Sequence, residues 1–129
     1  MKLTPLRCQW IYYWLSIAYL LTSFVTLMTM GKQLSPAGIH YSMILFSLYA
    51  LALLQYEKFT RVYNIVTVSA LVAFTYGGVY VNVMNLVNGD LSLYFSSSAW
   101  IIAVFINGFG SLANVAAFRK MINCTYMKG

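Results

Sequence analysis

The residues that could carry acid–base or metal chemistry are few and lie far apart in the sequence. The chain of 129 residues contains two acidic residues, Glu57 and Asp90, and a single histidine, His40. Catalysis by a carboxylate pair requires the two groups within roughly 5–10 Å of each other, whereas the topology derived below places Glu57 and Asp90 on opposite sides of a membrane. His40 has no histidine, cysteine or acidic residue near it, and a metal site requires several such ligands. We therefore predict neither a catalytic carboxylate pair nor a metal site.

The two cysteines, Cys8 and Cys124, do not form a CxxC motif, so they give little support to a redox enzyme. Both flank apolar stretches on the predicted cytoplasmic side, where we expect free thiols. The sequence also lacks a glycine-rich phosphate-binding loop and a zinc-binding HExxH helix. We predict a protein that is not an enzyme and that has no cofactor.

A sharper pattern is formed by small and polar residues that recur at helical spacing in two apolar stretches. The first stripe contains Ser69, Ala73 and Gly77, and the second contains Ala103, Asn107, Gly110 and Asn114. Small residues on one face let another helix approach closely, and a polar residue there can bond across the contact. We therefore predict close packing between the two helices that carry these stripes.

The expected register of this packing follows from matching the depth of two antiparallel helices. The expected pairs are Gly77 with Ala103, Ala73 with Asn107, and Ser69 with Gly110. Asn107 would then hydrogen-bond between the helices near the middle of a bilayer. We favour this clamp between helices, with a solute path lined by Asn107 and Asn114 as the alternative. Gly77 and Gly78 together also predict a local bend or a close helix approach.

The elements that must position these residues are four long apolar stretches. The chain is 61% hydrophobic and 8% charged, against about 25% charged in an ordinary soluble domain. About 20 apolar residues cross a bilayer as a helix, and the predicted spans are 10–30, 38–56, 62–84 and 94–118. Short connections force neighbouring spans to be antiparallel. The predicted fold is therefore a single all-α domain, residues 1–129, with four transmembrane helices in an up-down-up-down bundle.

Helix-start signals precede each predicted span. Thr4 and Pro5 form a cap-then-proline pair before the first span, which we expect to be retained rather than cleaved as a signal peptide. The expected starts of the later spans are Ser35 with Pro36, then Thr60, then Asp90 or Ser92.

The positions of the basic residues predict the orientation of the bundle. Seven of the eight lysines and arginines flank the first span, the second connection or the last span, and Lys32 stands alone in the first connection. The seven are Lys2, Arg7, Lys58, Arg61, Arg119, Lys120 and Lys128. The positive-inside rule then places both termini in the cytoplasm. The net charge of +6 is explained by these flanks, so no nucleic-acid partner is predicted.

Aromatic residues near the ends of the spans are interpreted as the belts that sit at the two membrane surfaces. On the cytoplasmic side these are Trp10, Tyr12, Tyr13, Trp14, Tyr56 and Tyr63, and on the outer side Tyr41, Tyr80 and Tyr94.

The function predicted from this pattern is a non-enzymatic accessory, assembly or scaffold subunit of a membrane complex. The short connections and the lack of reactive groups support it. The alternative is a small-solute transporter or channel that acts as a homodimer. The predicted partners are the lipid bilayer and either a larger membrane complex or a second copy of the chain, and the expected location is the inner membrane of the cell.

Overall fold

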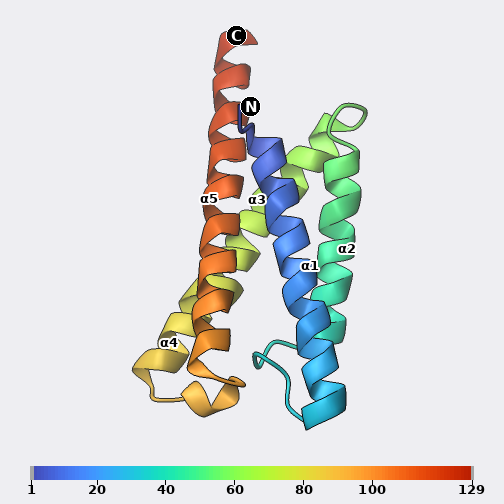
Figure 1. Ribbon diagram of the computed structural model, residues 1–129. Helices are drawn as coiled ribbons and strands as arrows, with labels where there is room; N and C mark the ends of the chain where they lie inside the picture. The colour runs from blue at the N-terminus through green and yellow to red at the C-terminus, as the bar shows by residue number, and fades with distance from the viewer. Residues whose placement is uncertain (1, 129) are drawn as a thin grey trace.

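The computed structural model describes residues 2–128, and within this range every regular element is a helix (Figure 1). The elements are α1 (Pro5–Met30), α2 (Ile39–Leu54), α3 (Thr60–Phe74), η1 (Thr75–Tyr80), α4 (Val81–Val87), η2 (Leu91–Leu93) and α5 (Ser97–Lys128). The predicted all-helical fold is confirmed. In the described residues, three helical runs are long and apolar enough to cross a membrane: α1, the continuous run 60–87, and α5.

The ends of α1 are set by local chemistry, and the start at Thr4 and Pro5 is the one predicted from the sequence. The Thr4 hydroxyl oxygen accepts a hydrogen bond from the backbone N–H of Arg7 at 3.3 Å, and Pro5 occupies the first turn. Gly31 closes the other end with a positive φ of 72°, and its N–H donates to the carbonyl of Leu27 at 3.0 Å. A left-handed residue of this kind is the usual end of a helix, and glycine adopts it without steric cost.

The prediction that Ser35 and Pro36 open the second helix is wrong. The helix α2 begins at Ile39, and Gly38 is its N-cap. Ser35 and Pro36 instead lie in the bent connection that precedes it. With 16 residues, α2 is about 24 Å long at about 1.5 Å per residue, which makes it the shortest of the four apolar helical runs.

The third apolar run is one helical path with a change of winding in the middle. It starts at Thr60, whose predicted role as the cap is wrong because Phe59 holds that position. From Thr75 to Tyr80 the winding is that of a π-helix, and α-helical winding resumes at Val81. Gly77 and Gly78, from which a local bend or a close helix approach was predicted, lie inside this π-helical segment.

The last helix, α5, also begins later than predicted. The Ser96 hydroxyl oxygen accepts from the backbone N–H of Ala99 at 3.1 Å, so Ser96 rather than Asp90 or Ser92 caps this helix. The chain before it turns at Gly89, which has a φ of 77°, and passes through the short helix η2. At its other end α5 continues to Lys128, well past the predicted span.

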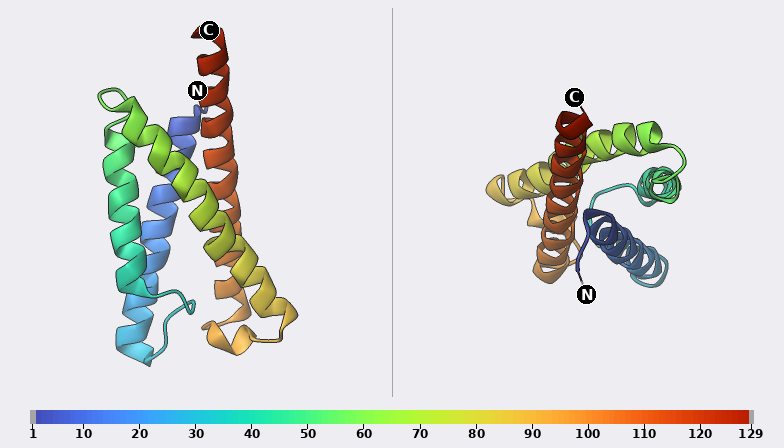
Figure 2. Two further views of the ribbon diagram at one scale, coloured as in Figure 1. Left: turned by 180° about the vertical axis from the view of Figure 1, so that it is seen from behind. Right: turned by 90° about the horizontal axis from the view of Figure 1, so that it is seen from above.

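The helices alternate in direction, so the connections fall at two ends of the molecule (Figure 1). The two chain ends and the connection 55–59 lie at one end, and the connections 31–38 and 88–96 lie at the other. Of the helix pairs, α1 and α5 make the most extensive contact. The end of α2 and the beginning of α3 lie side by side at the connection 55–59. With increasing distance from this connection the two helices diverge (Figure 2).

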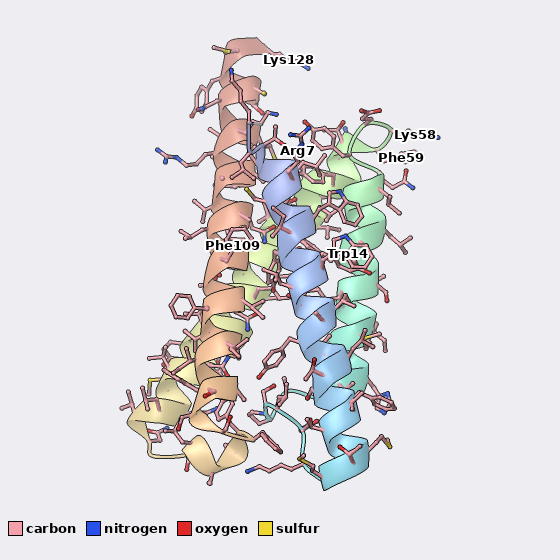
Figure 3. The ribbon with its side chains drawn as sticks, viewed as in Figure 1. Arg7, Trp14, Lys58, Phe59, Phe109 and Lys128 are labelled. Carbon is pink, nitrogen blue, oxygen red and sulfur yellow. The ribbon has the colours of Figure 1, made fainter. Side chains whose placement is uncertain are left out.

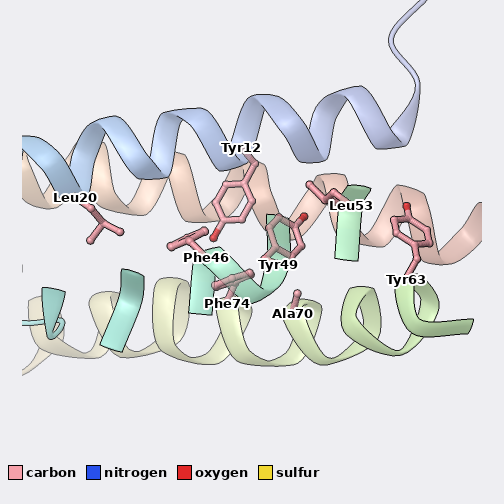
Figure 4. Close-up of a cluster of buried hydrophobic side chains, with 8 residues drawn as sticks. All are labelled: Tyr12, Leu20, Phe46, Tyr49, Leu53, Tyr63, Ala70 and Phe74. Atoms are coloured by element: carbon pink, nitrogen blue, oxygen red, sulfur yellow. The ribbon is translucent and has the colours of Figure 1, made fainter. Parts of the chain in front are cut away.

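The interior is built mainly from aromatic side chains (Figure 4). Tyr12 is fully buried, and its ring centroid lies 5.3 Å from that of Phe74 and 5.7 Å from that of Phe46. Phe46 and Phe74 stack with a centroid distance of 5.0 Å. Tyr12, Tyr63 and Tyr94 are all buried, so their assignment to aromatic belts is wrong: each side chain is turned into the helix contacts, where its hydroxyl finds a partner. Tyr41 and Tyr80 are exposed.

The outer surface is apolar on each of the long helices. Large exposed side chains include Leu21 on α1, Ile44 on α2, Val72 on α3 and Phe105 on α5. An apolar outside around a partly polar inside is typical of a helical protein whose solvent is lipid.

Candidate functional site: a buried polar network and the adjoining cavity

One hydrogen-bond network joins α1, α2, α3 and α5 inside the molecule. We call it the Gln9–Asn114 network, and its members are Gln9 of α1, Tyr49 of α2, Tyr63 and Thr67 of α3, and Asn114 of α5. The Gln9 amide Nε2 donates to Asn114 Oδ1 at 3.0 Å and to Thr67 Oγ1 at 3.3 Å. The Tyr63 hydroxyl donates to Gln9 Oε1 at 2.6 Å, and the Tyr49 hydroxyl donates to Asn114 Oδ1 at 3.1 Å.

The network is closed to solvent, and its side-chain amide groups have hydrogen-bond partners. Gln9 and Asn114 are both 0% exposed. The side-chain nitrogen Nδ2 of Asn114 donates to the carbonyl of Gly110 at 2.8 Å. Buried amides are costly when unpaired and stabilising when every group has a partner. The network therefore fixes how the four runs pack, without presenting a free reactive group.

A second polar contact lies farther along the same helices. The Tyr12 hydroxyl donates to Asn107 Oδ1 at 3.2 Å, and Asn107 Nδ2 donates to the carbonyl of Ala103 at 2.9 Å. Gly78 of η1 packs directly on this amide, since a Cβ added to Gly78 would lie 2.5 Å from Asn107 Cγ. Asn107 thus accepts its inter-helix hydrogen bond from α1, whereas the backbone that packs closest to its side chain is that of η1.

The stripe residues are brought together only in part. Gly78, rather than Ala73, lies against Asn107, and a Cβ on Gly77 would meet no atom within 4 Å. The ring that packs on Gly110 is that of Tyr12, not a side chain near Ser69. The register between the two helices is shifted from the predicted one, as the bond from Thr75 Oγ1 to Ser111 Oγ at 2.9 Å also shows.

This shift has a geometric cause. The predicted pairing assumed two straight helices of matched depth. Instead, α3 runs diagonally across α1 and α5 (Figure 2), and the π-helical segment alters its winding. The structure does place Ala73, Gly77, Ala103 and Asn107 around one cavity.

This cavity, which we call the η1 cavity, has a volume of about 430 Å³ and is bounded by α1, the connection 31–38, α2, the end of α3, η1, the start of α4, and α5. Its walls are mostly apolar and aromatic, and no charged residue lines it. Tyr41 and Tyr76 line it and are exposed, so the cavity opens to the surface where α2 and η1 have diverged. Ser16 lines it as well, and within residues 2–128 the buried Ser16 Oγ has no hydrogen-bond partner.

A third polar cluster closes the far end of the helices. The Tyr94 hydroxyl donates to Asn82 Oδ1 and accepts from Asn85 Nδ2, and Trp100 Nε1 donates to the carbonyl of Asn82 at 2.8 Å. Lys32 reaches across the two connections to the carbonyl of Ser92 at 2.7 Å. The Lys32 bond joins the connections 31–38 and 88–96, whereas the bonds of Tyr94 and Trp100 hold the connection 88–96 and the start of α5 against α4.

A second cavity, of about 300 Å³, lies at the end that holds the chain termini. It is bounded by the start of α1, the start of α3 and the last turns of α5, and Lys120 and Lys128 line it. On every helix shared by the two cavities, a buried side chain lies between them: Tyr12 on α1, Thr67 on α3 and Asn114 on α5. The interior is therefore closed between the two cavities.

The acid, histidine and cysteine candidates do not converge. Glu57 and Asp90 lie in connections at opposite ends of the molecule (Figure 1), and His40 is exposed at the start of α2. Cys8 and Cys124 are free thiols. Among residues 2–128 there is no group of three or more histidine, cysteine, aspartate or glutamate side chains that could hold a metal ion.

Sequence reasoning missed Gln9, Tyr12, Tyr49 and Ser16 as interior polar residues. Gln9 lies one residue outside the predicted first span, 10–30, so no interior role was predicted for it. A usable signal was the spacing of Gln9, Tyr12 and Ser16, which puts these polar groups on one face of a helix at intervals of three and four residues.

Comparison of the chain with models of protein families, with curated proteins and with solved structures finds no match.

Proposed function

We propose that this chain is a four-span integral membrane protein of the inner membrane, with both termini in the cytoplasm. Its proposed role is that of a non-enzymatic accessory, assembly or scaffold subunit of a larger membrane complex. The observation that carries the role is the closed interior: four helical runs are tied together by a satisfied polar network, and the two cavities do not meet.

The proposed orientation is supported by where the basic side chains gather. Arg7, Lys58 and Lys128 lie toward one end of the helices (Figure 3), and the other end holds Lys32, which is bonded to a backbone carbonyl. Basic flanks on the cytoplasmic side match the positive-inside rule. The exposed apolar side chains between the two ends provide the lipid-facing surface.

The topology can be tested by cysteine accessibility in sealed right-side-out membrane vesicles. One variant keeps only the exposed Cys124, with Cys8→Ser, and a second carries N88C in a background without the native cysteines. An impermeant maleimide is expected to label position 88 in sealed vesicles and position 124 only after detergent permeabilisation. A third variant with K32C tests whether α2 crosses. Equal labelling of positions 32 and 88 is expected, because a non-crossing α2 would leave only the run 60–87 between them and would place them on opposite sides.

The role can be tested by native mass spectrometry of the protein extracted gently from its own membrane. A reproducible heteromeric mass is expected, and the partner would then specify the function. Recovery as a monomer or a pure homodimer, at every detergent tested, would contradict the subunit role.

Small-solute transport by a homodimer is the second candidate, and Asn107 at the wall of the η1 cavity is the observation that favours it. Movement of a solute between the two cavities would require Tyr12 and the Gln9–Asn114 network to separate. Under this mechanism Asn107→Leu abolishes flux into proteoliposomes while the protein stays folded. Under the clamp interpretation the same variant unfolds more easily and leaves any flux intact.

A further inference from the structure

We propose that the η1 cavity is a binding site for an uncharged amphiphile: a lipid-soluble molecule with an elongated apolar body and one hydroxyl or carbonyl group. This proposal rests on the membrane location proposed above, but not on the subunit role. It is carried by the composition of the cavity wall, by its opening between α2 and η1, and by a buried hydroxyl that lacks a partner.

The ligand is uncharged because the wall offers nothing to pair with a charge. No lysine, arginine, aspartate, glutamate or histidine lines the cavity, and a buried charge without a partner is strongly disfavoured. Aromatic side chains, among them Phe46, Phe74 and Tyr76, provide apolar surface for the body of the ligand.

The polar group of the ligand would meet Ser16 and Asn107. Ser16 is 4% exposed, and its Oγ has no partner within the described chain, although buried polar groups are nearly always bonded. Asn107 already accepts from Tyr12 and donates to Ala103, which leaves one amide hydrogen and one lone pair for a further bond. A hydroxyl or carbonyl group placed between these two side chains would satisfy the Ser16 hydroxyl.

The size and the opening of the cavity fit a molecule that arrives from lipid. Its volume of about 430 Å³ is roughly fourteen times the ~30 Å³ that one water occupies in the liquid. The cavity therefore suits a ligand with about fourteen non-hydrogen atoms. The exposed Tyr41 and Tyr76 mark the opening between α2 and η1. In the proposed topology this opening faces the hydrocarbon of the outer leaflet.

The test uses the full chain in lipid nanodiscs and a long-chain alcohol that carries a photoreactive diazirine. Mass spectrometry of the labelled peptides is expected to place the label on residues of α2 and η1 that line the cavity. Excess 1-dodecanol should reduce this labelling several-fold, whereas dodecane, which lacks the hydroxyl, and dodecanoate, which is charged, should not. Equal competition by dodecane would overturn the proposal in favour of an ordinary acyl chain, and uniform labelling of all lipid-facing helices would overturn it altogether.

The variant that tests recognition is Ser16→Ala, which is expected to lower the labelling several-fold without altering thermal unfolding. The matched control is Ser23→Ala, two turns along α1, because the Ser23 hydroxyl oxygen accepts from the backbone N–H of Leu34 at 2.9 Å and does not line the cavity. This control should retain its labelling. If Ser16→Ala fails to fold, Gly77→Phe serves as a second variant, since a Cβ at Gly77 meets no atom within 4 Å and the ring would occupy the cavity mouth.

Unchanged labelling in a folded Ser16→Ala protein, or in a folded Gly77→Phe protein, would overturn the proposal. Failure of the labelling experiment can be distinguished from failure of the proposed topology or of the proposed subunit role. Cysteine accessibility reports the membrane topology, and native mass spectrometry reports the partner, whatever the probe does.

Discussion

The two halves of the helical core treat their buried polar groups differently. Toward the termini, the amides of Gln9 and Asn114 bond to tyrosine hydroxyls, a threonine and a backbone carbonyl, and solvent is excluded. Toward the other end, α2 and η1 diverge around a cavity in which the Ser16 hydroxyl has no partner among residues 2–128. The first half has the features of a fixed clamp and the second those of a receptive site.

The largest effect is expected where α1 and α5 touch most closely. A Cβ on Gly110 would overlap the ring of Tyr12, which is 0% exposed and packed among other aromatic rings. Gly110→Ala should therefore lower the free energy of unfolding by about 3 kcal/mol, at the upper end for overpacking. Reversible unfolding in a denaturing detergent measures this change.

The matched control for that variant is Gly108→Ala on the same helix. A Cβ there meets no atom within 4 Å, so the change should be neutral or stabilising by up to ~1 kcal/mol through helix propensity. Equal destabilisation by the two variants would contradict the close contact between Gly110 and Tyr12.

The next effect tests the Gln9–Asn114 network itself. Asn114→Ala removes the acceptor for both Gln9 and Tyr49 and leaves two buried donors without it. Hydrogen bonds between membrane helices are worth about 0.6–2 kcal/mol each, so a loss of about 2 kcal/mol is expected in the same unfolding assay. Asn64→Ala is the control, because Asn64 is only half-buried and lines the second cavity; it should change stability by less than ~0.5 kcal/mol.

A smaller effect is expected at the boundary between the two halves. Gly78→Ala places its methyl group against the Asn107 side chain, part of which can rotate away, so a loss of about 1–2 kcal/mol is expected. Its neighbour Gly77 has open space around the same position, and Gly77→Ala should leave the unfolding midpoint unchanged or raise it. If Gly77→Ala were the more harmful of the two, the register described here would be wrong.

The contrast between the halves also shows what the sequence could predict. The four apolar runs, the Thr4–Pro5 start of α1 and the disturbance at the glycine pair follow from hydrophobic length, capping and helix propensity, which are local properties. The burial of Tyr12 and the pairing of Gly78 with Asn107 do not, because they depend on the diagonal path of α3 relative to α1 and α5. Gln9 was missed for a related reason: hydropathy ends a span at the first polar residue, although that residue can turn inward and find partners.

The smallest expected change in stability comes from removing one serine hydroxyl of α1, and the difference between Ser16 and Ser23 tests the contrast between the two halves. Removing a hydroxyl that has a partner leaves the other group unsatisfied, whereas removing one that lacks a partner costs almost nothing. Ser23→Ala, which takes the acceptor from the Leu34 N–H, should lower the free energy of unfolding by about 1 kcal/mol. Ser16→Ala should change it by less than ~0.5 kcal/mol or raise it, since the Ser16 Oγ is buried without a partner in the described chain. A loss at Ser16 as large as that at Ser23, measured without any amphiphile, would mean that Ser16 is bonded within the fold, and the receptive half would then be a second clamp.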